Sequence, residues 1–151
     1  MPQPKTTYDI VLPALLRAAR GTYAEEIRHR LAAAGFEDMP RNGPFVLGGM
    51  VNHGGSAGDL IRGLGITKQA AGQLIDTLVL RGYLERQVHP DDRRRMVIQV
   101  TERGGAAAAV VRTGVEAIDA ELARRLSPDE LHGLRVGLAT LGDIGEEVRG
   151  R

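Results

Sequence analysis

The sequence predicts a mainly α-helical fold that carries one small antiparallel β-hairpin. Three observations predict it: two short helical patterns joined by a tight turn between residues 57 and 80, two strand-like runs between residues 83 and 101, and longer helical patterns on either side. With 151 residues, 42% of them hydrophobic and 26% charged, the chain is long enough to bury a core. We therefore expect one compact domain spanning residues 1–151.

Two helices are expected before the helical pair. The first runs over residues 8–34, with Pro13 close enough to its start to be tolerated. Its apolar stripe consists of Ile10, Val11, Leu15, Leu16, Ala19, Tyr23, Ile27 and Leu31. The second is a short helix over residues 43–51, although glycines and prolines interrupt its pattern. Its expected inward residues are Phe45, Leu47 and Met50.

The patterns between residues 57 and 80 have the spacing of a helix-turn-helix. Ser56 precedes the first helix, where its hydroxyl can cap the helix or meet a phosphate. That helix is expected over residues 57–64, with Leu60, Ile61 and Leu64 facing inward. After a turn at Gly65, Thr67 is typical of the N-cap of a second helix. The second helix is expected to bury Ala70, Ala71, Leu74, Ile75, Leu78 and Val79.

The opposite face of the second helix is polar. It consists of Thr67, Lys68, Gln69, Gly72, Gln73 and Asp76. Glutamine can pair with adenine edges, and lysine can bind guanine or phosphate. We therefore expect Thr67, Lys68, Gln69 and Gln73 to face the major groove of DNA. The plainer alternative is a solvated face, because glutamine is also a good helix former.

The hairpin is predicted by an alternating run at residues 83–88 and a β-branched run at residues 96–101. Gly82 ends the preceding helix, and residues 89–95 are expected to form the hairpin tip. This places Arg93, Arg94 and Arg95 at an exposed turn, where like charges repel unless an anion is near. Phosphate is the natural anion.

Two further helices are expected at the C-terminal end. Thr101 can cap a helix over residues 102–125, and Ser127 and Glu130 have the spacing of a capping box that starts another. A helix of 24 residues is about 36 Å long and would expose an apolar face unless something covered it. We expect a second copy of the chain to cover this apolar face.

The composition restricts the classes of function. The chain has no cysteine, which excludes disulfides, thiol switches and cysteine-ligated metals. No apolar run is long enough to span a membrane and no signal-peptide pattern opens the chain, so we expect a cytoplasmic protein. The net charge is only +1, but basic residues exceed acidic ones by two between residues 59 and 103.

No catalytic or metal-binding constellation is evident. The sequence has no H-E-x-x-H pair, no G-K-[ST] phosphate loop and no G-x-S-x-G elbow. Asp91 and Asp92 are adjacent in a solvated turn, which gives no contrast in pKa for acid–base catalysis. His53 and His89 lack partners at metal-ligand spacing. We expect neither an enzyme, nor a cofactor, nor a metal site.

The motifs together resemble the MarR family of winged helix-turn-helix transcription regulators. The resemblance rests on T-K-Q-A-A-G-Q-L-I-D-T-L at residues 67–78, R-G-Y-L-E-R at 81–86, and H-P-D-D-R-R-R with V-T-E-R-G between 89 and 104. It implies a DNA-binding lobe over residues 55–103 and a helical dimerisation lobe formed by residues 8–34 and 104–149. In such a homodimer, Tyr8 to Ile27 and Val115 to Val148 would form the interface.

The resemblance also implies roles for particular residues. The family's Asp-x-Arg feature maps onto Asp92 and Arg94, in which the carboxylate steadies a guanidinium inserted into the minor groove. Arg93 and Arg95 would then bind phosphates. A small aromatic or apolar effector would contact Tyr23, Phe45 and Met50 and release the protein, as a repressor, from an inverted-repeat operator.

Plainer alternatives accompany these roles. Asp92 and Arg94 can form a surface ion pair of little energetic weight, and a charge run is usually solvated. A winged helix can also serve as a protein-interaction module without sequence-specific DNA binding. Salt dependence separates the two functions, because phosphate contacts weaken steeply with salt whereas an apolar interface does not.

Overall fold

The structure is a computed structural model that describes residues 10–53 and 56–150. The chain divides into two compact units, one ending at Val115 and one beginning at Glu116. Tyr8, the expected start of the first helix and of the dimer interface, and the glycines Gly54 and Gly55 before α3 lie outside the described residues.

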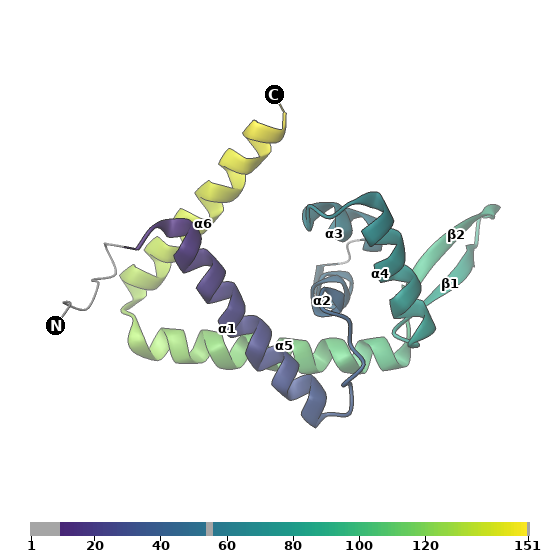
Figure 1. The fold of residues 1–151 in the computed structure, drawn as a ribbon, viewed down its shortest axis with the longest axis horizontal. Coiled ribbons are helices and arrows are strands. Elements are labelled where there is room, and N and C mark those ends of the chain that lie inside the picture. The colour runs from purple at the N-terminus through teal and green to yellow at the C-terminus, as the bar shows by residue number, and fades with distance from the viewer. Residues whose placement is uncertain (1–9, 54–55, 151) are drawn as a thin grey trace. The chain divides into compact units, whose positions relative to one another are not determined.

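Six helices and one antiparallel sheet of two strands make up the described residues (Figure 1). They are α1 (Leu12–Ala33), α2 (Gly43–His53), α3 (Ala57–Gly63), α4 (Lys68–Leu80), β1 (Leu84–His89), β2 (Asp92–Val100), α5 (Glu102–Arg125) and α6 (Pro128–Arg149). The predicted class, mainly helical with one β-hairpin, is confirmed. None of the described helices is both long and apolar enough to cross a membrane.

The core of the first unit is built from α1 to α4, the start of β1 and the first half of α5. Its buried residues are Leu31, Val46, Leu47, Ala57, Ile61, Leu74, Leu78, Tyr83, Leu84, Ala107, Ala108 and Val111. Most of them are the apolar residues that recur at helical spacing. Full burial of one of the larger side chains stabilises the fold by roughly 1.5–3 kcal/mol. The core fixes α4 and the base of the hairpin relative to α2 and α3.

Glycine forms the two turns that bracket α4. Gly65 has a φ of +65° between α3 and α4, and Gly82 has a φ of +74° directly after α4. This left-handed region suits glycine because no Cβ clashes there. The expected turn at Gly65 and the expected stop at Gly82 are confirmed.

A polar junction joins four elements at the base of the hairpin. The Asp38 carboxylate accepts hydrogen bonds from the Tyr83 hydroxyl and from Arg103, the latter at 2.9 Å, and the Asp38 carbonyl accepts one from Arg81. The Arg103 guanidinium lies 4.7 Å from the Tyr83 ring centroid and 5.3 Å from that of Phe36. The Tyr83 bond, with help from Arg103, lowers the pKa of Asp38, whereas burial raises the pKa of Tyr83. The junction ties the loop after α1 to the starts of β1 and α5.

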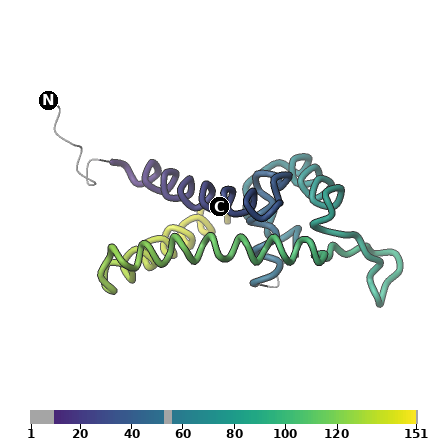
Figure 2. Tube along the Cα trace, turned by 90° about the horizontal axis from the view of Figure 1, so that it is seen from below, coloured from purple at the N-terminus to yellow at the C-terminus, as the bar shows by residue number. Residues whose placement is uncertain are grey.

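The two strands form a hairpin, here called the wing. It is a narrow ribbon that projects away from the rest of the first unit (Figure 2). Leu84 pairs with Val100 at its base, and Val88 pairs with Met96 near its outer end. Beyond this pair the register shifts, so that His89 pairs with Asp92. The expectation that residues 89–95 form only a turn is therefore wrong, because β2 begins at Asp92 and the arginines lie within an irregular part of that strand.

The helices differ from their predicted form in α1, which begins at Leu12 with Val11 as its N-cap instead of at residue 8, and in α2. α2 extends to His53, and its inward residues are Val46 and Leu47, whereas Phe45 is 49% exposed. The prediction that Phe45 faces inward is wrong, because the glycines around it give no clear apolar spacing from which to orient the helix. The N-cap at Thr101 and the capping box of Ser127 and Glu130 are confirmed.

Candidate nucleic-acid interface

The start of α4 is organised by its cap. The Thr67 hydroxyl accepts the backbone N–H of Ala70 at 3.1 Å, which satisfies one of the free donors at the helix start. α4 buries Leu74 and Leu78 against the core. Because these residues fix the rotation of the helix, the polar face is left exposed, and Lys68, Gln69 and Gln73 all lie on the surface.

Ser56 caps α3, as the sequence predicts. Its hydroxyl accepts the backbone N–H of Asp59 at 3.1 Å and donates to the Asp59 carboxylate at 2.6 Å. The Ser56 bond and the adjacent guanidinium of Arg62 lower the pKa of Asp59. Ser56 thus has a structural role as the cap of α3, and its predicted phosphate contact stays a prediction.

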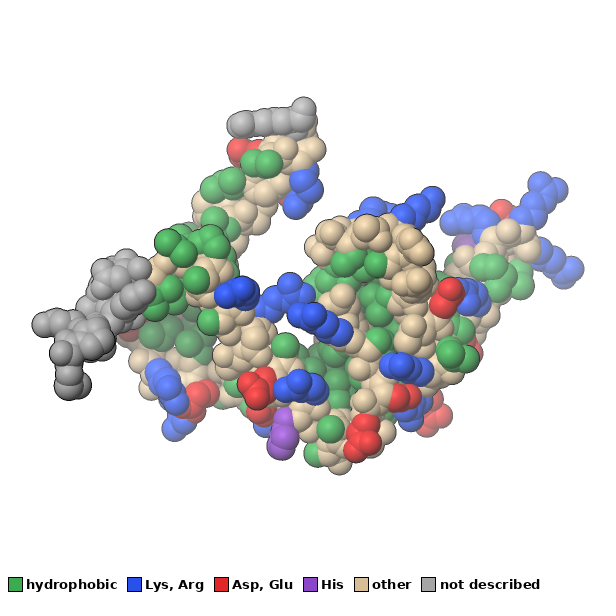
Figure 3. Space-filling view, in the orientation of Figure 1, with side chains coloured by type: hydrophobic (Ala, Val, Ile, Leu, Met, Phe, Trp, Pro, Cys, Tyr) green, Lys and Arg blue, Asp and Glu red, His purple; other side chains and the backbone are tan. Residues whose placement is uncertain are grey.

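The three wing arginines are all exposed at the outer end of β2 (Figure 3). The Asp92 carboxylate accepts the backbone N–H of Arg94 at 3.0 Å, and no ion pair joins it to the Arg94 guanidinium in the described part of the chain. The carboxylate therefore shapes the backbone of the strand, while the guanidinium extends into solvent. The predicted pairing of the two side chains in the minor groove stays a prediction.

An ion pair ties the wing to α4. Arg86 of β1 contacts the carboxylate of Asp76 of α4 at 2.5 Å, with both side chains partly exposed. Arg86 projects from the wing face that includes Leu84 and Val88, since alternate residues of a strand share a face. Gln73 lies four residues after Gln69, and Asp76 lies three residues after Gln73, so all three lie on the exposed side of α4. The pair places one face of the wing beside the polar face of the helix.

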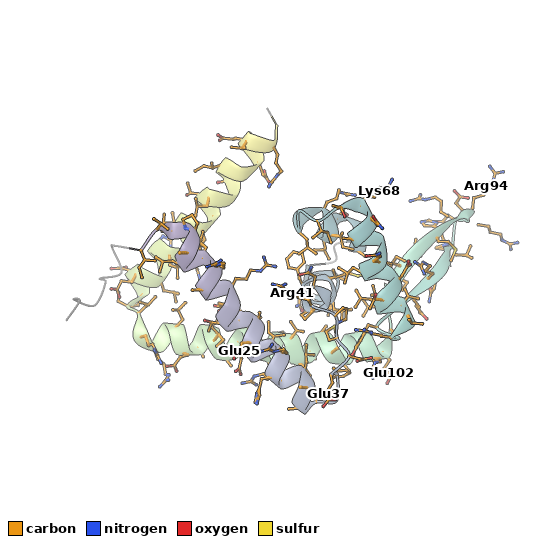
Figure 4. All side chains as sticks on the ribbon, in the orientation of Figure 1. Glu25, Glu37, Arg41, Lys68, Arg94 and Glu102 are labelled. Carbon is orange, nitrogen blue, oxygen red and sulfur yellow. The ribbon has the colours of Figure 1, made fainter. Side chains whose placement is uncertain are left out.

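The structure brings most of the predicted DNA-binding residues to two places on the first unit. Thr67, Lys68, Gln69 and Gln73 lie on α4, and Asp92 to Arg95 lie at the end of the wing. In Figure 4 the side chains of Lys68 and Arg94 both extend away from the core. Ser56 lies apart from both, at the start of α3.

Sequence reasoning missed Arg86 and the junction residue Arg103. Arg86 occupies an otherwise apolar face of the wing, between Leu84 and Val88, and that break in the alternation was the available signal. Arg103 joins Asp38 across 65 residues, and no local pattern indicates a contact of that range.

The predicted effector residues have different surroundings. Tyr23 is half-buried on α1, Phe45 is half-exposed on α2, and Met50 packs against the core. Their role as walls of a ligand site stays a prediction.

Comparison with known proteins gives a match to one family model and a similar fold in solved structures. The family model for the MarR family matches residues 38–95, which include α2, α3, α4 and most of the wing. A search of curated protein sequences found no match to this chain.

Several solved structures are similar to this chain. RV1404 from Mycobacterium tuberculosis is 26% identical, with 95% of this chain and 97% of that one covered and a TM-score of 0.65. A structure of MarR is 22% identical, with 97% and 99% covered and a TM-score of 0.74. MepR of S. aureus, solved as a DNA complex, is 18% identical, with 89% and 98% covered and a TM-score of 0.70. These likenesses extend over nearly the whole of each chain.

Proposed function

We propose that this chain is a member of the MarR family, whose model matches its winged-helix segment at residues 38–95, and that it binds double-stranded DNA and regulates transcription. The observation that carries the proposal is the presence, on one unit, of an exposed polar recognition face on α4 and an arginine-rich wing. The complex of MepR with DNA supports it by analogy of fold.

Each exposed residue has a proposed role. Gln69 and Gln73 read base edges in the major groove, because the amide of glutamine can pair with adenine in two hydrogen bonds. Lys68 binds guanine or phosphate from the first turn of α4, and Thr67 and Ser56 contact the sugar-phosphate backbone of the DNA. Arg94 enters the minor groove, and Arg93 and Arg95 bind phosphates on either side of it.

The apolar face of α6 supports a dimer. Leu131, Leu134, Leu138, Leu141, Gly145 and Val148 follow one another at alternating spacings of three and four residues. This is the seam of a helix that packs lengthwise on another helix. None of the described residues of α6 is buried, and Leu134, Leu138, Leu141 and Val148 are exposed. We propose that a second copy of the chain covers this seam.

The start of α1 presents a second apolar surface. Val11, Leu12 and Leu16 are exposed, and α1 buries only Leu31 among its residues. Water-exposed apolar side chains at this density mark a surface that another protein covers. Its burial in the same dimer accords with the interface expected from the family.

A dimer would turn two copies of α4 into one recognition device. Two recognition helices related by a two-fold axis and about 34 Å apart meet successive major grooves of an inverted repeat. We propose that the chain is a repressor of such an operator. A small aromatic or apolar effector would release it by binding more tightly to a dimer shape that does not fit the operator.

The proposal is tested by selecting bound duplexes from a random DNA pool and measuring affinity for the selected duplex at 50 and 200 mM salt. We expect an inverted repeat, and a loss of affinity of about 10³–10⁵ between those salt concentrations if six to ten phosphates are contacted. Failure to enrich any sequence, with weak or salt-independent binding, would favour the protein-interaction module instead.

The role of the wing is tested with Arg94→Ala. Removing one groove-binding charge should weaken operator binding and reduce the slope of log affinity against log salt by about 1. Arg28→Ala is the matched control, because Arg28 is an exposed arginine of α1 outside the proposed surface. Unchanged binding by Arg94→Ala would contradict the assignment of the wing, whereas the dimer should persist in both variants.

A further inference from the structure

The wing carries an exposed apolar pair beside its arginines. Val88 is 52% exposed and Met96 is 56% exposed, and they are direct cross-strand partners near the outer end of the hairpin. They are the exposed large apolar residues among the described residues of the two strands. Figure 3 shows green apolar atoms next to the blue arginine atoms in this region.

The folding of the wing does not account for this pair. At the base of the hairpin, Leu84 and Val100 are held by the core, and Ile98 is half-buried against it. Val88 and Met96 lie farther out, beyond the core contacts, where polar residues would serve a solvated hairpin equally well. Their side chains are available to a partner.

The pair lies on the wing face that is turned toward α4. Val88 and Met96 share a face with Arg86 and Ile98, because residues two apart on a strand, and their cross-strand partners, project to the same side. Arg86 contacts Asp76 on the exposed side of α4. A duplex seated on that side of α4 would therefore also face the apolar pair.

From this arrangement we infer that Val88 and Met96 form an apolar contact surface for the deoxyribose wall of the DNA groove that the wing enters. A nucleic-acid backbone alternates anionic phosphates with apolar sugar faces. The outer wing offers the matching alternation, with three arginines directly followed by Met96 and paired across to Val88. Apolar side chains are commonly inserted into the minor groove by proteins that bind there.

This role of Val88 and Met96 rests on the proposed function, and it separates the binding free energy of the wing into two parts. The arginines supply the salt-dependent part of the binding free energy, because they displace counterions from phosphates. The apolar pair supplies a salt-independent part, because it only removes carbon surface from water. The two contributions can therefore be separated by titrating salt.

The test uses one variant that carries both Val88→Thr and Met96→Gln. Its affinity for the selected operator is compared with that of the wild type at several salt concentrations. Threonine and glutamine keep the side-chain size and threonine suits a strand, so the wing should keep its form, which thermal unfolding would verify. We expect an affinity about tenfold lower with the salt slope unchanged. Should the double variant fail to fold, Met96→Gln alone makes the same comparison, with a smaller loss expected.

Two controls accompany the test. Met96→Leu keeps an apolar side chain of similar volume and should retain affinity to within about twofold. Gln99→Thr alters an exposed residue on the other face of β2, opposite Glu85, and should bind as the wild type does. Wild-type affinity in the double variant, or a salt slope that falls together with the affinity, would overturn the inference. A wild-type protein that selects no duplex would instead overturn the proposed function on which it rests.

Discussion

Two adjacent glycines in the first turn of α5, Gly104 and Gly105, differ in whether a side chain would fit at their position. A Cβ added at Gly104 would lie 2.1 Å from the Tyr83 carbonyl oxygen and 2.9 Å from a methyl group of Val100. A Cβ added at Gly105 would meet nothing within 4 Å. Gly104 is thus the position where the hairpin base passes directly over the helix, and Gly105 is an ordinary helical site.

We predict that Gly104→Ala destabilises the protein by about 2 kcal/mol or more, because the backbone of Tyr83 must move to admit a methyl group. Gly105→Ala should instead stabilise it by about 0.5–1 kcal/mol, since alanine is the better helix former. Urea unfolding of the two variants measures both effects. Equal effects of the same sign would contradict the close approach of β1 to α5.

At the scale of elements, the junction at Asp38 links the loop after α1 to the end of α4 and to the starts of β1 and α5. The Asp38 carboxylate is its centre. The ionised Asp38 carboxylate is stabilised in the folded state by the Tyr83 hydroxyl and by Arg103, which is why the pKa of Asp38 is lowered. A lowered carboxyl pKa contributes stability that is present above the unfolded-state value of 3.8 and is lost as the pH falls through the folded-state value.

We predict that Asp38→Asn lowers the free energy of unfolding at neutral pH and that the difference from the wild type shrinks as the pH falls below 3.8. The effect should be about 1 kcal/mol or less, because the carboxylate is 45% exposed and screened by solvent. Thermal unfolding followed by circular dichroism from about pH 3 to about pH 7 covers the relevant range. Glu37→Gln, at the exposed neighbouring residue, should behave as the wild type throughout.

The elements show why some of this architecture could be predicted from the sequence and some could not. The caps at Thr67 and Ser127 depend on residues three positions apart, so a local pattern reveals them. The start of β2 at Asp92 depends on an irregular register with β1, and polar arginines gave no strand signal there. The role of Arg103 depends on packing between distant segments, which only the folded chain brings together.

The candidate site divides in the same way. The exposure of Gln69 and Gln73 follows from the helical spacing of Leu74 and Leu78, so the sequence predicts it correctly. The hydrogen bond of Asp92 to the backbone of Arg94, and the apolar face shared by Val88 and Met96, follow from cross-strand geometry. The sequence alone did not specify that geometry beyond the presence of a hairpin.

For the whole molecule, the proposed dimer determines whether the recognition surface can read an inverted repeat. The seam of α6 gives a direct test, because Leu138 lies within it and Val136 lies on the opposite side of the same helix. Both residues are exposed in the single chain, so neither substitution opens a cavity in it. Any difference between the two variants therefore reports what covers the helix.

We predict that Leu138→Asp converts the protein from dimer to monomer in sedimentation or light-scattering measurements, because a carboxylate buried in an apolar seam is strongly unfavourable. Operator affinity should fall with it, since a monomer engages only one half-site and loses the gain of linked binding. Val136→Asp introduces the same charge outside the seam and should remain a dimer with unchanged operator affinity. If Leu138→Asp also stays dimeric, the seam is not the interface, and two-fold recognition by paired copies of α4 would have to be assembled through another surface.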